Sequence, residues 1–186
     1  MDNEQDIIIL CQQGDLERFG WLYDKYIKKI YDFIYFKTTH KETAEDLTSL
    51  TFIKALEKIK TFNADKGTFS AWLYQIARNT VIDFYRTKKE IVDIDDIWDL
   101  AGNKNIERDF DVSAKLQSVE KYLAKLKSDQ REIIIMRIWS ELTYAEIAEV
   151  LGKSEASCKM SFSRAIAVLR KEMPLELLIS FLLLSR

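Results

Sequence analysis

Apolar residues recur at intervals of three and four along most of the chain, which is the spacing of one buried face of an α-helix. In the N-terminal half this pattern predicts helices over 4–12, 15–37, 43–59 and 68–88. In the C-terminal half it predicts helices over 113–127, 128–139, 144–151 and 155–172. The sequence therefore predicts an all-α protein of two small helical domains, residues 1–88 and 113–172, joined by a linker over 89–112 and followed by an apolar tail over 173–186.

Local signals mark several of the expected helix boundaries. Asp15 is expected to cap the helix over 15–37, and Ser128 is expected to cap the helix over 128–139. The segment Asn63–Gly67 has the composition of a loop. Pro174 suits the first turn of a helix, so the tail is expected to form a packed terminal helix, with a regulator docking site and a membrane-surface contact as alternatives.

Composition and charge fit this helical reading. The 186 residues include only 5 Gly and 1 Pro, too few for the many tight turns of a sheet protein. The net charge of -2 is unevenly distributed, because residues 90–112 carry eight acids against two bases. The linker is therefore acidic and the remainder of the chain carries a net positive charge, so the charge must be read segment by segment.

The chain offers little for catalysis, metal binding or membrane insertion. Cys11 and Cys158 lie far apart in helical patterns, which favours a reduced, cytoplasmic setting. His40 is the single histidine, and it has no partners at metal-ligand spacing. The apolar run 175–184 is about half of the length that a spanning helix needs. We expect a cytoplasmic protein without enzymatic activity, cofactor, metal or small-molecule substrate.

The strongest local motif is a helix-turn-helix over 143–172. Thr143 and Glu146 have the spacing of a capping box. Ala148 allows close helix approach, Gly152 permits a left-handed turn, and Cys158 can be buried between the helices. The outer face of the second helix would enter a DNA major groove, although a plain helical hairpin is an alternative for this segment alone. The candidate DNA contacts here are Thr143, Ser154, Ser157, Lys159, Ser163 and Arg164.

A second candidate surface lies on the helix predicted over 68–88. Its expected outward face interleaves cations, aromatic rings and amides, a combination that suits single-stranded DNA. A solvated basic face over an aromatic core is the alternative for this helix taken alone. The candidate contacts, with two from the preceding loop, are Asn63, Lys66, Tyr74, Arg78, Asn79 and Arg86.

In this order the motifs resemble the sigma-70 family of RNA polymerase sigma factors, specifically its extracytoplasmic-function subgroup. The resemblance extends from about Gly14 to Glu172. It rests on Ala44-Glu45-Asp46-Leu47 with Phe52 and Ala55, on Phe69–Asn79 with Asp83 and Arg86, and on Leu126, Gln130-Arg131-Glu132 and Leu142–Gly152 through Lys159 and Arg164. Ser49-Leu50 departs from the family's usual Gln-Glu pair.

The resemblance implies a role for each part of the chain. Residues 1–88 would bind the polymerase clamp and open the −10 promoter element, and residues 113–172 would read the −35 element as duplex. Glu45, Asp46 and Ser49 would contact the clamp. The expected partners are core RNA polymerase, through its clamp and flap regions, and promoter DNA, with an anti-sigma factor as a possible further partner.

Two other functions compete with this one. A one-component helix-turn-helix regulator would use residues 1–88 for dimerisation or sensing, and it would bind a palindromic duplex by itself as a dimer. An anti-sigma factor or helical adaptor would make no DNA contact. Such a protein would have no need for the basic residues Arg78, Arg86 and Lys88.

Overall fold

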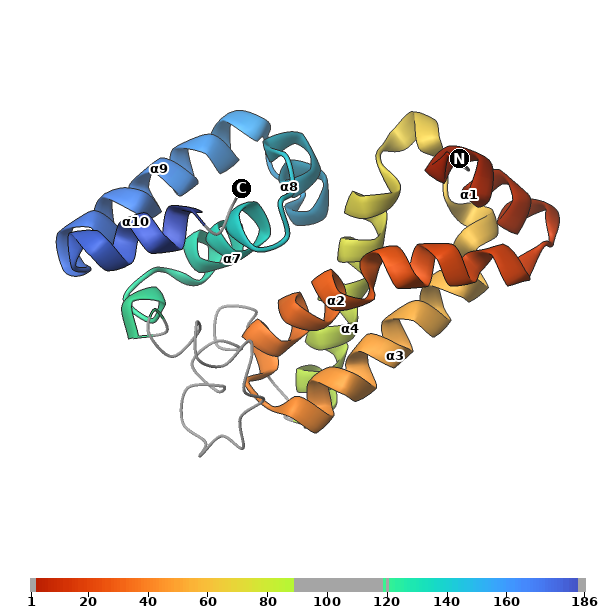
Figure 1. The fold of residues 1–186 in the computed structure, drawn as a ribbon, viewed down its shortest axis with the longest axis horizontal. Helices are drawn as coiled ribbons and strands as arrows, with labels where there is room; N and C mark the ends of the chain where they lie inside the picture. The colour runs from red at the N-terminus through yellow and green to blue at the C-terminus, as the bar shows by residue number, and fades with distance from the viewer. Residues whose placement is uncertain (1–2, 89–118, 120, 184–186) are drawn as a thin grey trace.

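The structure is a computed structural model that describes residues 3–88, 119 and 121–183. The described residues are helical and contain no strand, in agreement with the predicted all-α fold. The acidic linker predicted over 89–112 lies outside the described residues. The helices form two groups, which Figure 1 shows side by side.

The N-terminal domain contains α1 (Glu4–Gln13), α2 (Phe19–Thr38), α3 (Lys41–Lys58) and α4 (Phe69–Lys88). Short 3-10 turns lie between them at Leu16–Arg18, Ile59–Thr61 and Ala64–Lys66. Helices α2, α3 and α4 pack against one another around a core of aromatic and aliphatic side chains. At the N-terminal end of α4, the rings of Phe62, Phe69 and Trp72 lie within 5.4–5.6 Å of one another, centroid to centroid.

The C-terminal domain contains α7 (Ser128–Ile138), α8 (Tyr144–Leu151), α9 (Glu155–Glu172) and α10 (Leu175–Leu183). The predicted helix-turn-helix is confirmed as a fold element. Thr143 accepts a hydrogen bond from the Glu146 N–H at 3.2 Å, and Glu146 accepts one from the Thr143 N–H at 2.8 Å. Gly152 follows α8 with φ of 63°, and Cys158 of α9 is fully buried.

The apolar tail forms α10, so the expectation of a packed terminal helix is confirmed for the described part. Phe181 is 1% exposed and meets Trp139 edge to face, with ring centroids 4.9 Å apart. Leu178 is also buried, whereas Leu175 and Ile179 face solvent at 68% and 50% exposure. The described residues include no helix that is long and apolar enough to cross a membrane.

Two predicted caps were wrong. Asp15 makes no capping hydrogen bond, because a 3-10 turn intervenes and α2 begins only at Phe19. Gly14, just before it, ends α1 with φ of 109°. Ser128 is the first helical residue of α7 rather than its cap, and the flanking Lys127 N–H donates to Gln130 Oε1. A residue before a 3-10 turn was thus mistaken for the cap of α2, and the first helical residue for the cap of α7.

Two glycine-to-alanine substitutions are expected to change stability in opposite directions. Gly152→Ala forces a Cβ into the left-handed region, which costs about 1–2 kcal/mol. Gly20→Ala lies in the first turn of α2 and is expected to stabilise by about 0.5 kcal/mol. Neither new Cβ would meet another atom within 4 Å, so backbone conformation alone separates them. Urea unfolding followed by circular dichroism measures both, and equal effects would contradict this account of the turn.

Candidate nucleic-acid interface

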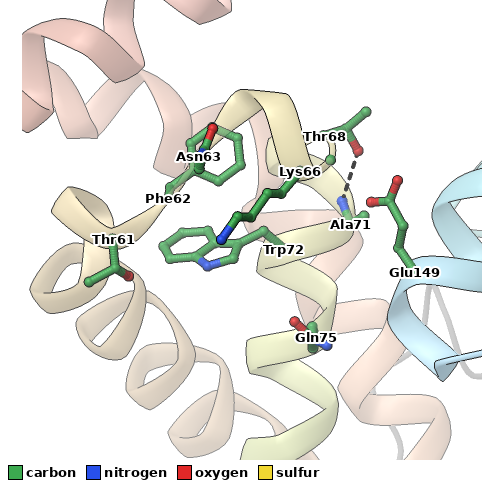
Figure 2. A pocket seen from close by; sticks show the side chains of 10 residues that line it. Thr61, Phe62, Asn63, Lys66, Thr68, Ala71, Trp72, Gln75 and Glu149 are labelled. Carbon is green, nitrogen blue, oxygen red and sulfur yellow. Dashed lines mark hydrogen bonds between the residues drawn. The ribbon is translucent and has the colours of Figure 1, made fainter.

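A pocket of about 340 Å³ opens where the loop before α4 meets the first turns of that helix. Its volume is at the lower end of the range for small-molecule pockets. Figure 2 shows Asn63, Lys66 and Trp72 around the pocket and Glu149 approaching from α8. The lining combines aromatic rings, amides and one cation with small residues: Thr61, Phe62, Asn63, Lys66, Gly67, Thr68, Ala71, Trp72, Gln75 and Glu149.

Local hydrogen bonds set the shape of the pocket loop. Asn63 Oδ1 accepts from the Asp65 N–H at 2.9 Å and so holds the 3-10 turn. Thr68 Oγ1 accepts from the Ala71 N–H at 3.1 Å, the arrangement of a helix N-cap (Figure 2). These bonds fix the loop against α4, because each satisfies a backbone donor at the start of a helical turn.

The structure brings some of the predicted single-strand contacts together. Asn63 and Lys66 line the pocket, as expected for adjacent loop residues. Asn79 lies exposed on α4, one turn beyond the pocket residue Gln75, and Arg86 is exposed near the end of the helix. A row of polar side chains therefore leads from the pocket along α4.

Tyr74 was wrongly placed on the outward face of α4. Its side chain is 0% exposed, and its ring meets Phe33 edge to face at 5.2 Å between centroids. The helical face that covers α2 is wider than the sequence pattern indicated. Tyr74 is therefore a core residue that cannot stack a base in this structure.

Arg78 was expected to point outward but is held in a buried ion cluster between the two domains. Its Nε lies 3.0 Å from Glu132 Oε1, and Lys37 Nζ lies 2.6 Å from the same oxygen. The side chains of Arg78, Lys37 and Glu132 are 17%, 6% and 3% exposed. Arg78 is thus unavailable to DNA in this arrangement.

The electrostatics of the cluster follow from one carboxylate facing two cations. Burial alone would raise the pKa of Glu132, but the fields of Lys37 and then Arg78 outweigh it and lower the pKa. Burial lowers the pKa of Lys37, and Glu132 offsets this only in part. Glu132 is therefore held ionised, and the charges stabilise one another only while the domains are in contact.

The second candidate surface is the outer face of α9 with the turn before it. Ser154 caps α9 by accepting from the Ser157 N–H at 3.2 Å. Lys159 Nζ lies 2.6 Å from Glu155 Oε1, one turn away on the same helix. Cys158, Ala165 and Leu169 are buried, so the opposite face is free for a groove. All six predicted contacts are exposed: Thr143, Ser154, Ser157, Lys159, Ser163 and Arg164.

The third surface is the outer face of α3. Glu45, Asp46 and Ser49 are all exposed there, as the sequence indicated. The structure adds Leu50 and Ile53, which are 40% and 53% exposed. Because Asp46, Leu50 and Ile53 are spaced four and three residues apart, they share one helical face. This face therefore combines carboxylates with exposed apolar side chains.

Comparison with known proteins shows the family of the chain. Residues 22–91 match the Sigma-70 region 2 family model, and residues 116–169 match that of Sigma-70, region 4. The ECF RNA polymerase sigma factor BldN of Streptomyces coelicolor is 33% identical over 177 residues, 91% of this chain and 65% of BldN. RNA polymerase sigma factor YlaC of Bacillus subtilis is 33% identical over 156 residues, 82% of this chain and 90% of YlaC. The chain belongs to the extracytoplasmic-function sigma factors of the sigma-70 family.

The fold of this sigma factor has a counterpart among solved structures. The sigma factor RpoE from Bartonella quintana, solved with the anti-sigma factor NepR, is 27% identical with a TM-score of 0.65. The similarity covers 82% of this chain and 94% of that one. Region 2 occupies the segment that a one-component regulator would use for dimerisation or sensing, so that alternative is set aside.

Sequence reasoning missed several residues of this sigma factor. Trp72 was not among the predicted contacts, yet it lines the pocket while packing on Phe62 and Phe69. Glu132 and Lys37 were missed as a pair, because they are 95 residues apart. No local sequence pattern predicts a contact between residues so far apart in the chain.

Proposed function

We propose that residues 1–88 bind core RNA polymerase and capture the −10 promoter element, while residues 113–172 read the −35 element as duplex. The observation that carries the proposal is the pocket at the start of α4, which lies inside the region 2 match. Lys66 would contact a phosphate, and Trp72 offers an aromatic face beside it. The role is that of a transcription initiation factor without catalysis.

The chemistry of the pocket suits a base turned out of the duplex. Flipping costs a few kcal/mol, which stacking and base-edge hydrogen bonds must offset. Trp72 supplies a partly exposed π-face, and Asn63 and Gln75 supply amides that can donate and accept. Asn79 and Arg86 would extend the contact along the single strand, and Arg78 would join them once released from Glu132.

The outer face of α3 is the proposed clamp contact. Glu45, Asp46 and Ser49 contribute its polar part, and Leu50 and Ile53 its apolar part. Exposed apolar side chains next to carboxylates are typical of a protein interface with specific charge pairing. Leu50 is thus an apolar side chain at the position where the family usually carries a charged one.

Region 4 is proposed to place α9 in the major groove of the −35 element. Ser154, Ser157 and Lys159 lie at its N-terminal end, which reaches base edges in helix-turn-helix proteins. Arg164 lies farther along and would contact phosphate. The setting would be the cytoplasm. An anti-sigma factor is proposed as a regulatory partner, by analogy with the RpoE–NepR complex.

Substituting Asn79 with Ala tests the single-strand role. The loss of one amide contact to a base is expected to lower promoter opening about tenfold while leaving core polymerase binding unchanged. Opening is measured by permanganate reactivity of unpaired thymines with the reconstituted holoenzyme. Gln13→Ala removes another exposed amide, from α1, and should have no effect. Loss of polymerase binding in the Asn79 variant would refute its assignment to DNA.

Arg164→Ala tests the duplex contact. Removing one phosphate contact should reduce the slope of log affinity against log salt by about one unit. The measurement is binding of the holoenzyme to −35-containing duplex over a range of salt concentrations. Arg18→Ala removes the same charge from the N-terminal domain and should leave the slope unaltered. An unchanged slope for the Arg164 variant would argue against a phosphate contact.

A further inference from the structure

A large apolar side chain lies on the outer face of α9, the helix that the proposed function places in the major groove. Helix α9 packs on α7 and α8 (Figure 1), and its buried residues are Cys158, Ala165 and Leu169. At 3.6 residues per turn, Met160 lies about 140–200° around the helix axis from each of these three. Met160 is 52% exposed. Its side chain therefore points away from the domain core, at the middle of the outer face.

Polar side chains surround Met160 on this face. Ser157 and Ser163 lie three residues before and after it, and Arg164 lies four residues after it, so all three share its face. Each is exposed, and each is already a proposed contact to the −35 duplex. An apolar side chain among hydroxyls and a cation has the composition of a surface that reads base edges, where hydrogen bonds are combined with single apolar contacts.

The packing of α8 fixes the direction of this face. Phe162 of α9 meets Tyr144 of α8 edge to face, with ring centroids 5.7 Å apart. Lys159 is drawn to the same side, because its Nζ lies 2.6 Å from Glu155 Oε1 and 5.8 Å from the centroid of the Tyr144 ring. The Lys159 side chain is thus directed toward α8 and leaves Met160 uncovered.

The charge along α9 favours a nucleic acid over a protein as the occupant of this face. Residues 153–171 carry five bases and one acid, a net charge of +4. Such a surface is complementary to phosphate groups. The core of a protein interface, in contrast, is depleted of charged residues and built from several apolar side chains. One methionine among hydroxyls and cations does not offer that apolar area.

The base edges in the major groove differ in whether they offer an apolar group. Thymine presents a C5-methyl group there, whereas the other bases present hydrogen-bond donors and acceptors. The methionine side chain is unbranched, flexible and polarizable, so it adapts its shape to a methyl group. Over another base it would cover a donor or acceptor without replacing the hydrogen bond to water, which is unfavourable. Met160 therefore suits a thymine.

We propose that Met160 determines specificity in the −35 element through contact with the C5-methyl group of a thymine. Met160 lies in the second turn of α9, within the N-terminal part that approaches base edges in helix-turn-helix proteins. The inference rests on the proposed function, because it names a base that the proposed −35 surface reads. The promoters of this protein therefore share a thymine at the −35 position that faces the second turn of α9.

Replacing thymine with uracil tests the contact, because uracil lacks the C5-methyl group and keeps the hydrogen-bonding groups of thymine. The probe is a promoter fragment that the reconstituted holoenzyme transcribes, in which the thymines of the −35 element on both strands are replaced one at a time. Competition binding gives the ratio of affinities for the thymine and uracil fragments. At one position the parent holoenzyme should prefer thymine about fourfold, the usual effect of burying one methyl group.

Substitutions at Met160 complete the test. Holoenzyme with Met160→Ala should bind the thymine fragment about fourfold more weakly and lose the preference at that position. Met160→Leu keeps an apolar side chain of similar volume, so it should retain most of the preference. Ile179→Ala is the matched control, since Ile179 is 50% exposed and lies on α10; it should change neither the affinity nor the preference.

The inference is overturned if the parent distinguishes thymine from uracil at no −35 position, or if Met160→Ala retains the preference. An equal loss of affinity for all fragments also overturns it, because Met160 would then contact another part of the complex. If the parent protein directs no transcription with core polymerase, the proposed function itself fails, and the inference falls with it. Circular dichroism of each variant checks that the substitution leaves the helices intact.

Discussion

Replacing Phe181 with Ala is expected to lower the unfolding free energy of the C-terminal domain by about 3–5 kcal/mol, the usual cost of deleting a buried aromatic ring. Phe181 is 1% exposed and lies against Trp139, so the cavity left behind cannot be filled by a simple side-chain shift. Urea unfolding followed by circular dichroism gives the free energy of unfolding for both variant and parent.

Ile179→Ala is the matched control on the same helix. Its side chain is 50% exposed, so the change should stay within about 0.5 kcal/mol. If both substitutions have small effects, α10 is not part of the domain core, and the tail would be free to serve as a docking segment. Because Trp139 also meets Phe36, the Phe181 variant should in addition loosen the contact between the domains.

Replacing Trp72 with Ala is expected to reduce promoter opening roughly 10- to 100-fold, because one base-stacking contact is worth about 1–3 kcal/mol. Trp72 lines the pocket and packs on Phe62 and Phe69, with centroids 5.5 and 5.4 Å away. Permanganate footprinting of the holoenzyme on a linear promoter fragment measures the effect.

Trp72→Phe distinguishes stacking from loss of structure. A phenyl ring keeps a π-face and most of the packing, so this variant should recover most of the opening. Binding to a −35 duplex should be unchanged in both variants, since α9 lies in the other domain. Equal loss for Phe and Ala would point to the indole N–H or to its volume rather than to stacking.

Much of the local structure was predictable from the sequence because its causes are local. The helix-turn-helix depends on a capping box, a left-handed glycine and small residues at fixed spacing, and α8 and α9 begin and end where these signals placed them. The exposed face of α9 followed from the same periodicity. The loop with Asn63 and Lys66 was predictable from its composition, and both residues line the pocket.

What could not be predicted depends on contacts that are distant in sequence. Tyr74 is buried because α2 covers a wider part of α4 than the apolar pattern shows. Arg78 is sequestered because Glu132, 54 residues later, comes from the other domain. The sequence identified Arg78 as a cation on a helical face. No pattern in the neighbouring residues indicated that its counterion would be Glu132 of the other domain.

The most direct test of the central claim is run-off transcription with sigma-free bacterial core polymerase on genomic fragments that include the upstream region of the protein's own gene. The account predicts discrete transcripts that appear only when the protein is added and that depend on sequences about 10 and 35 base pairs upstream of each start. An absence of such transcripts, together with tight binding of the protein alone to duplex DNA, would contradict the sigma-factor function.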